Sequence, residues 1–282
     1  MKKNLNGSVW KKSYRYLVLI ILTVICLFPF YLLLINATRP HVDIQRGFSI
    51  LPGTFLVDNI KNVLNNETIL IVRGMINSAI VAGCSVVLSV YFSVMTAYAI
   101  HVYDFRLKKA AFNFILLIMT IPTQVSALGF VKMITAMNLK DSFIPLIIPA
   151  IVAPSCVFFM KQYMESSLPL EIVEAARIDG SGEFGTLNRI ILPIMKPALA
   201  VQAIFGFVSN WNNYFTPSLV LTKAEMKTLP LWIAYLRSAD FTKFDMGQLY
   251  MMIAVSIFPV VIVYLFLSKF IVQGVTLGSV KG

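Results

Sequence analysis

The sequence of 282 residues has few charged residues, and these are unevenly distributed. They make up 13% of the chain, about half of the fraction usual in soluble domains. They cluster between long uncharged stretches, and 58% of all residues are hydrophobic. A soluble domain has no reason to separate its charges in this way, so the composition indicates a membrane protein.

Cysteine and histidine are also scarce. Cys26, Cys84 and Cys156 lie inside apolar runs and form no C-x-x-C pair, so we expect them in helix packing rather than in a disulfide framework. His41 and His101 are isolated in the sequence. We therefore expect no metal site.

Residues for chemical catalysis are missing as well. The segment Gly180-Ser-Gly-Glu-Phe-Gly-Thr186 spaces its glycines like a phosphate-binding loop, but it lacks the lysine before the hydroxyl residue and follows a predicted helix. We find no nucleophile–base pair and no pair of catalytic carboxylates. We therefore expect no catalytic residue and no ATP site in this chain.

Six long intervals lack Asp, Glu, Lys and Arg: 16–38, 74–100, 110–131, 142–160, 197–222 and 246–268. At about 1.5 Å per residue, a helix over each interval can cross a hydrocarbon core of roughly 30 Å. No interval shows the alternation of a membrane β-strand. The predicted fold class is all-α, a polytopic membrane protein with six transmembrane helices.

The absence of acids within these intervals also bears on mechanism. Proton-coupled carriers tend to need ionisable groups inside the membrane, so a carrier of that kind is disfavoured. A sodium-coupled carrier with backbone and hydroxyl ligands stays open.

Basic residues predict the orientation. Five cations precede the first interval: Lys2, Lys3, Lys11, Lys12 and Arg15. The positive-inside rule then places both termini in the cytoplasm. The first interval is too long for a signal peptide and has no A-x-A cleavage pattern. We read the net charge of +11 as anchoring to membrane lipid, and expect no nucleic-acid partner.

The segment 167–193 departs from the apolar pattern. Ser167 and Pro169 predict a helix start, Gly180 predicts its end, and a second short helix from about Glu183 is expected to end before Pro193. Six charges at about 3 kcal/mol each exclude this segment from the bilayer. It is predicted to be a cytoplasmic helix–turn–helix whose apolar side comprises Leu170, Val173, Ala176 and Ile178.

Two partners suit such a segment. Interfacial helices on lipid are usually rich in Lys and Arg, whereas this segment carries four acids and only two arginines. We therefore favour docking to a protein partner over binding to lipid.

The fifth interval carries a polar stripe at helical spacing: Gln202, Gly206, Ser209, Asn213 and Thr216. With its neighbours it predicts a candidate translocation path that comprises Gln202, Ser209, Asn210, Trp211, Asn213 and Tyr214. Neutral amides beside aromatic rings suit a sugar, whose hydroxyls need hydrogen bonds. Hydrogen bonding between helices is the other interpretation of the stripe, and the sequence leaves both open.

The helix–turn–helix resembles the cytoplasmic loop of bacterial ABC importer permeases. It matches their signature E-A-A-x3-G-x9-I-x-L-P at all seven fixed positions: Glu174, Ala175, Ala176, Gly180, Ile190, Leu192 and Pro193. Three further segments resemble the shorter permease of maltose-type carbohydrate importers, namely 210–217, 228–231 and 270–282. The resemblance covers nearly the whole chain.

This resemblance implies the type I ABC importer permease fold and a domain organisation. Residues 1–70 would form an N-terminal cytoplasmic segment, the first helix and the first extracellular loop. The shared transmembrane domain would span 71–271, with five helices and the coupling loop 165–193, followed by a cytoplasmic tail 272–282.

The resemblance also implies partners. The loop would act as a coupling helix in a cleft of an ATPase subunit, and two such subunits, rather than this chain, would use ATP and Mg. A second homologous permease would complete the path. An extracellular solute-binding protein would meet the region 223–245.

The predicted function is therefore import of a sugar, such as a di- or oligosaccharide, by a subunit that is not itself an enzyme. Within the same class, the alternative is another organic solute such as glycerol phosphate or a polyamine. From other classes, the alternatives are a stand-alone secondary carrier and a membrane-bound assembly factor.

Overall fold

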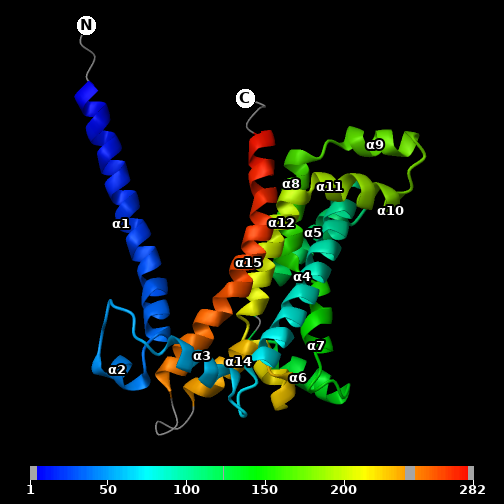
Figure 1. Cartoon of the computed structure of the whole chain (residues 1–282). Helices are drawn as coiled ribbons and strands as arrows, with labels where there is room; N and C mark the ends of the chain where they lie inside the picture. The colour runs from blue at the N-terminus through cyan, green and yellow to red at the C-terminus, as the bar shows by residue number, and fades with distance from the viewer. Residues whose placement is uncertain (1–4, 123, 239–244, 279–282) are drawn as a thin grey trace. The chain divides into compact units, whose positions relative to one another are not determined.

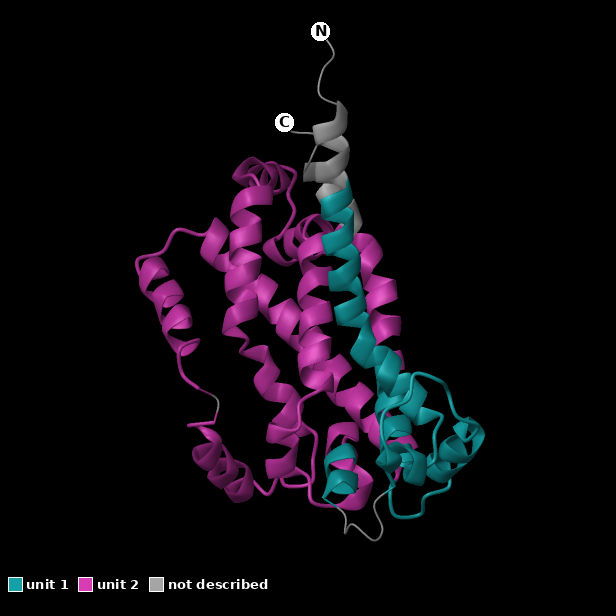
Figure 2. Cartoon of the chain, turned by 90° about the vertical axis from the view of Figure 1, so that its left-hand side faces the viewer, with its two compact units in different colours: residues 1–69, 233–257 teal, residues 70–232, 258–282 magenta. Residues whose placement is uncertain are grey.

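The computed structural model describes residues 5–122, 124–238 and 245–278, and side chains only within 13–271 of these ranges. The described residues form helices, turns and loops with no strand, which confirms the all-α fold class. The chain divides into two compact units (Figure 2). Unit 1 comprises residues 1–69 and 233–257, and unit 2 comprises 70–232 and 258–282.

Unit 1 contains the long first helix and short helices that follow it (Figure 1). Its elements are α1 (Leu5–Ala37), α2 (His41–Arg46), α3 (Leu56–Leu64), the end of α14 (Leu229–Arg237) and the start of α15 (Met246–Gly278). The predicted tail 272–282 overlaps the end of α15, and its last four residues lie outside the described part of the chain.

Buried polar side chains hold the segment after α1. Arg39 donates to the carbonyl oxygens of Asp43 and Gly47, at 2.6 and 3.1 Å. The Asn59 amide donates to the carbonyl oxygens of Ala37 and Arg39, at 2.9 and 3.0 Å. The C-terminal carbonyls of a helix lack partners within the helix, so the bond from Asn59 to Ala37 stabilises the end of α1, and the Arg39 bonds hold the chain that follows.

Unit 2 is a helical bundle with the predicted helix–turn–helix at one end (Figure 1). Its elements are α4 (Ile71–Val102), α5 (Lys108–Ile118), α6 (Ala127–Ala136), α7 (Ile144–Ile147), η1 (Ile148–Ile151), α8 (Pro154–Ser167), α9 (Leu170–Ile178), α10 (Glu183–Thr186), η2 (Leu187–Ile191), α11 (Leu192–Ile194), α12 (Lys196–Trp211), α13 (Phe215–Val220), η3 (Ala224–Met226), the start of α14 and the rest of α15.

The core of unit 2 forms where α4 contacts α8 and α12. Val94 and Ala97 of α4 are fully buried against Met160 and Met164 of α8. Inside a membrane, lipid tails are as apolar as these side chains, so helix association depends on close packing. The small side chain of Ala97 allows that close approach.

Among the described residues, four helical segments are long and apolar enough to cross a membrane: 13–37, 71–102, 144–167 and 246–271. A fifth results if 183–194 and α12, which meet at an angle of 80°, count as one span. The count of six crossings thus stays a prediction.

Three of the predicted intervals are not single helices. The interval 142–160 runs through α7, η1 and α8, which together still form one apolar segment, 144–167. The other two intervals are interrupted more strongly. The interval 110–131 is divided between α5 and α6, and 197–222 between α12 and α13, so one continuous helix over each interval was wrong. In the first case Pro122 lacks an N–H and disfavours helical geometry in the residue before it. In the second, Asn213 accepts the N–H of Thr216 and so begins a new helix.

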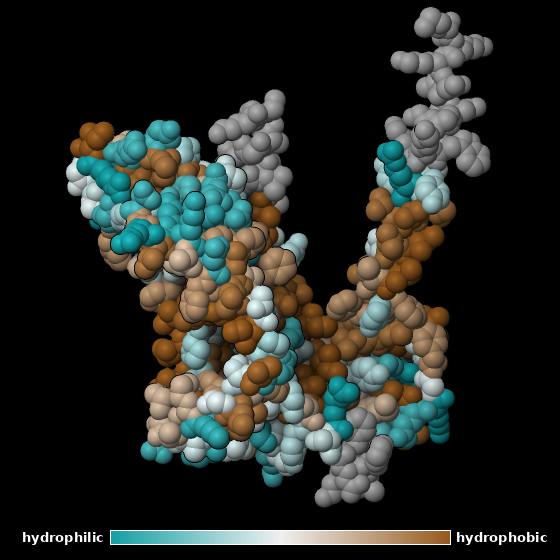
Figure 3. Space-filling view, turned by 180° about the vertical axis from the view of Figure 1, so that it is seen from behind, coloured by the Kyte–Doolittle hydropathy of each residue, from teal (hydrophilic) through white to brown (hydrophobic). Residues whose placement is uncertain are grey.

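Hydrophilic and hydrophobic residues are separated on the surface of unit 2. Figure 3 shows hydrophilic residues gathered on the helix–turn–helix and hydrophobic residues on the helices of the bundle next to it. This pattern is expected for helices in lipid whose charged loop lies in water.

A tight contact at the start of α4 gives a test of this fold. A Cβ at Gly74 would lie 2.6 Å from Cδ1 of the buried Trp232, whereas a Cβ at Gly83 in the same helix would meet nothing within 4 Å. We predict that Gly74→Ala lowers stability by about 1–3 kcal/mol through overpacking, measured as a lower melting temperature in detergent. Gly83→Ala is the matched control and should not lower it. Equal melting temperatures of the two variants would contradict the packing at Gly74.

Candidate functional sites

The first arm of the helix–turn–helix is α9. It begins directly after Pro169, and no side chain caps its N-terminus. Ser167 is instead the last residue of α8, so the predicted serine cap was wrong. Proline fits this position because its missing N–H would have no partner in the first turn.

The turn at Gly180 is confirmed. Its φ of +76° lies in the left-handed region that favours glycine. The Gly180 N–H donates to Arg177 O at 3.0 Å, and the Ser181 N–H donates to Ala176 O at 2.9 Å. These two bonds form a Schellman motif, which satisfies the last carbonyls of α9.

The second arm is longer than predicted. After α10, the π-helical turn η2 leads into α11, so helix continues through Pro193 to Ile194. The expected end before Pro193 was wrong. The N–H of Leu192 bonds to the carbonyl of Leu187, five residues earlier, and π-turns of this kind occur often at functional sites.

The seven signature residues fall into two groups by burial. Exposed residues are Glu174, Ala175, Gly180 and Pro193, whereas Ala176 is buried and Ile190 and Leu192 are half-buried. Ile190 and Leu192 pack against the core around α4 and α8. The first group faces outward, and the second attaches the loop to the bundle.

The expected apolar side of α9 is only partly buried. Val173 and Ala176 are buried, but Leu170 is exposed and Ile178 is 87% exposed. Phe184 of α10 is also 69% exposed. These exposed apolar side chains lie on the arms of a segment that is otherwise highly charged, a combination typical of a protein-binding surface.

Glu183 joins the two arms to α4. Its carboxylate accepts a hydrogen bond from Arg177 Nε at 2.8 Å and another from the Tyr98 hydroxyl at 2.9 Å. Hydrogen bonds from Tyr103 and Arg177, and then from Tyr98, hold the pKa of Glu183 below its ordinary value. The resemblance gave no signal for this cluster, because Arg177 and Glu183 are not signature positions.

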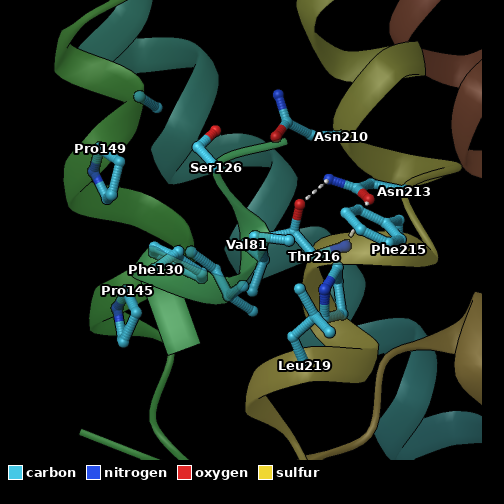
Figure 4. Close-up of a pocket in the computed structure, with 14 residues that line it drawn as sticks. Val81, Ser126, Phe130, Pro145, Pro149, Asn210, Asn213, Phe215, Thr216 and Leu219 are labelled. Carbon is cyan, nitrogen blue, oxygen red and sulfur yellow. Dashed lines mark hydrogen bonds between the residues drawn. The ribbon is translucent and has the colours of Figure 1, made fainter. Parts of the chain in front are cut away.

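A pocket of about 380 Å³ lies at the other end of unit 2 (Figure 4). Its wall comes from α4, α6, α7, η1, α12 and α13, and none of its lining residues is charged: Val81, Ser126, Ala127, Phe130, Pro145, Leu146, Pro149, Ala150, Asn210, Asn213, Phe215, Thr216, Pro217 and Leu219.

Polar groups line the pocket on two sides. Figure 4 shows Ser126 on one side and Asn210, Asn213 and Thr216 on the other. The Asn213 amide donates to Thr216 Oγ1 at 3.5 Å, and the Asn210 amide donates to the carbonyl of Gly206 at 2.8 Å. Each amide oxygen remains an acceptor for a further donor.

Thr216 of the predicted polar stripe lines this pocket, but only part of the predicted translocation path does. Asn210 and Asn213 do, whereas Gln202, Ser209, Trp211 and Tyr214 do not. Trp211 is 2% exposed and stacks on Phe207 at a centroid distance of 5.6 Å, and Tyr214 is exposed. The contributions of Ser126 and Phe130 were missed, because 110–131 was taken as one straight helix.

Asp141 connects two loops near this pocket. Its carboxylate accepts hydrogen bonds from the backbone N–H of Thr222, the Thr222 hydroxyl and the N–H of Lys223, and its own N–H donates to the carbonyl of Val220. Desolvation raises the pKa of Asp141, but these bonds outweigh it, so the pKa lies below its ordinary 3.8.

Residues 89–277 match the model of a protein family described as the binding-protein-dependent transport system inner membrane component. The chain belongs to this family. It is therefore a membrane transport subunit rather than an enzyme.

Similar proteins and structures agree with this assignment. The chain is 35% identical to the arabinooligosaccharides transport system permease protein AraQ of Bacillus subtilis, over 93% of this chain and 92% of that one. It is 28% identical to the sn-glycerol-3-phosphate transport system permease protein UgpE of Yersinia pestis, over 92% and 94% of the two chains.

A solved structure confirms the fold. A chain from the crystal structure of a bacterial ABC transporter that imports the acidic polysaccharide alginate aligns with a TM-score of 0.80, at 22% identity, over 94% of this chain and 97% of that chain. A second structure, of an alginate transporter in complex with an alginate pentasaccharide-bound periplasmic protein, aligns with a TM-score of 0.60 at 17% identity. The type I ABC importer permease fold implied by the signature is confirmed.

Asp141 gives a test of the two loops that it connects. We predict that Asp141→Ala speeds amide hydrogen exchange of residues 222–226 by roughly five- to ten-fold, because two amides lose their acceptor. The exposed Asp104→Ala is the control and should leave that segment unchanged.

The same bonds predict a pH dependence. Because the pKa of Asp141 is lowered on folding, its stabilisation is fully present at neutral pH and is lost as the pH falls below 3.8. Exchange in Asp141→Ala should lack this pH dependence. If residues 222–226 are equally protected in the variant and in the unmodified protein at neutral pH, the proposed role of the Asp141 hydrogen bonds is contradicted.

Proposed function

We propose that this chain is the permease subunit of an ATP-binding-cassette importer that moves a sugar, such as a di- or oligosaccharide, into the cell. The observation that carries this proposal is the complete seven-residue signature on a helix–turn–helix whose exposed side is free to meet a partner. Both termini lie in the cytoplasm in this proposal, since five basic residues precede the first span.

The helix–turn–helix docks on an ATPase subunit. Glu174 and Ala175 are exposed on α9, so the carboxylate can pair with a basic side chain and the small neighbour allows close approach. Ile178 and Phe184 offer apolar anchors beside these residues. Two ATPase subunits bind ATP and Mg, and their closure moves the docked loop, while this chain binds neither ligand.

The pocket forms this subunit's part of the translocation path, and a second, homologous permease closes its open side. A neutral pocket with amide and hydroxyl groups suits the hydroxyls of a sugar. A glycerol phosphate would call for Arg or Lys near its phosphate, and a polyamine would call for carboxylates. No lining residue carries either charge, which favours the sugar.

An extracellular binding protein delivers the sugar to the outer segment 223–238. The relatives' family description names a binding protein, and an alginate transporter was crystallised with its periplasmic protein. Residues 239–244 of the predicted contact region 223–245 lie outside the described residues.

Co-purification tests the ATPase partner. From native membranes in mild detergent, the tagged protein should bring down a P-loop ATPase and a second permease. Glu174→Lys should lose the ATPase but keep the second permease, because it reverses a charge only on the docking surface. Glu67→Lys, an equal charge change at an exposed site outside this loop, is the control. A chain that comes down alone or as a homodimer would favour a stand-alone carrier.

A second experiment tests the pocket. We predict that Asn210→Ala or Asn213→Ala lowers sugar uptake roughly ten-fold, the effect of one lost hydrogen bond to a buried polar partner. Asn212→Ala is the matched control, because this exposed amide donates to the carbonyl of Val208 in its own helix and does not line the pocket. If Asn210→Ala and Asn213→Ala take up sugar as fast as Asn212→Ala and the unmodified protein, the pocket is not on the translocation path.

A further inference from the structure

Polar side chains fix the cytoplasmic end of α4 to the helix–turn–helix. Tyr98 of α4 is 4% exposed and donates to Glu183 at 2.9 Å. Arg177 of α9 pairs with the other oxygen of Glu183 at 2.8 Å, and its guanidinium lies 5.6 Å from the ring centre of Tyr103 at the end of α4. An exposed ion pair alone contributes little, but here the carboxylate also binds a buried hydroxyl of the bundle.

A different set of contacts fixes the opposite end of α4 to the outer segment. The Asn77 amide donates to the carbonyl oxygens of Glu225 and Lys227, both at 2.9 Å. The Ser78 hydroxyl, 3% exposed, accepts the N–H of Leu229 at 2.8 Å. Gly74 provides the space for Trp232, so this end of α4 holds the segment 225–232 through three successive contacts.

Between these two sets of contacts, α4 is one continuous helix. It has 32 residues and contains no proline, so it is about 48 Å long at roughly 1.5 Å per residue. Its middle is buried against α8 and α12. A packed helix of this kind moves as a unit, because interiors repack between discrete arrangements rather than deform continuously.

We infer that α4 is a rigid connection through which the outer segment 225–232 and the cytoplasmic helix–turn–helix move together. This inference rests on the proposed function, in which the outer segment receives a binding protein and the loop docks on an ATPase. It assigns Tyr98 and Ser78 as positioning residues: each acts through a hydrogen bond to another segment, and both are too buried to touch a partner directly. Binding on one side of the membrane would thereby change ATP hydrolysis on the other.

The test uses the whole complex in nanodiscs, with ATP hydrolysis measured without and with the sugar-loaded binding protein. Tyr98→Phe removes one oxygen at the inner end of α4, and Ser78→Ala removes one at the outer end. Ser89→Ala is the control, because this hydroxyl donates to Val86 O of its own helix rather than to another segment. Asn77→Leu is a second outer variant that keeps the approximate size of the side chain but removes its donor.

We expect each α4 variant to lower stimulation by the binding protein roughly five-fold or more, while basal hydrolysis and the amount of bound ATPase stay as in the unmodified complex. The double variant Tyr98→Phe/Ser78→Ala should be no worse than the more affected single variant, because both act on one connection. Ser89→Ala should be unaffected.

Unchanged stimulation in the α4 variants would overturn the inference. The inference would also be overturned if the two single effects multiply in the double variant. The same holds if basal hydrolysis falls as much as stimulated hydrolysis. In both cases the contacts would act only locally. If the unmodified protein brings down no ATPase, the proposed function itself fails, and the inference fails with it.

Discussion

The close packing of α4 against α8 and α12 is the contact on which the functional parts of unit 2 depend. Fully buried side chains, from the small Ala97 to the larger Met160, bring these helices together, and in lipid such packing replaces the hydrophobic driving force of soluble proteins. The helix–turn–helix attaches to this core through Ile190 and Leu192, and the pocket takes one wall from α4 and another from α12. One packed core thus positions both sites.

Much of this arrangement could be predicted from the sequence, because lipid excludes charged side chains and the loops in water carry them. Uncharged runs mark the membrane helices, and six charges between residues 171 and 189 exclude that stretch from the bilayer. Gly180 predicted a turn that the structure places in the left-handed region. The signature residues predicted the family, but not that Ile190 and Leu192 pack inward while Glu174 faces outward.

The missed features depend on local breaks that hydropathy does not record. The break between α5 and α6 brings Ser126 and Phe130 to the pocket, although the run 110–131 is uniformly uncharged. The π-turn before Pro193 lets the helix continue where proline alone predicts an end. Trp211 and Asn210 are neighbours in sequence, yet one packs on Phe207 and the other lines the pocket, because the direction of each side chain follows from tertiary packing.

The measurement that tests the central claim most directly is uptake of labelled oligosaccharide into proteoliposomes. The vesicles would contain this chain with its co-purified permease and ATPase, or this chain alone, with the binding protein supplied outside. The account predicts uptake only by the full complex, and only with ATP on the ATPase side and binding protein on the other. Uptake by this chain alone, without ATP, would contradict it and identify a stand-alone carrier.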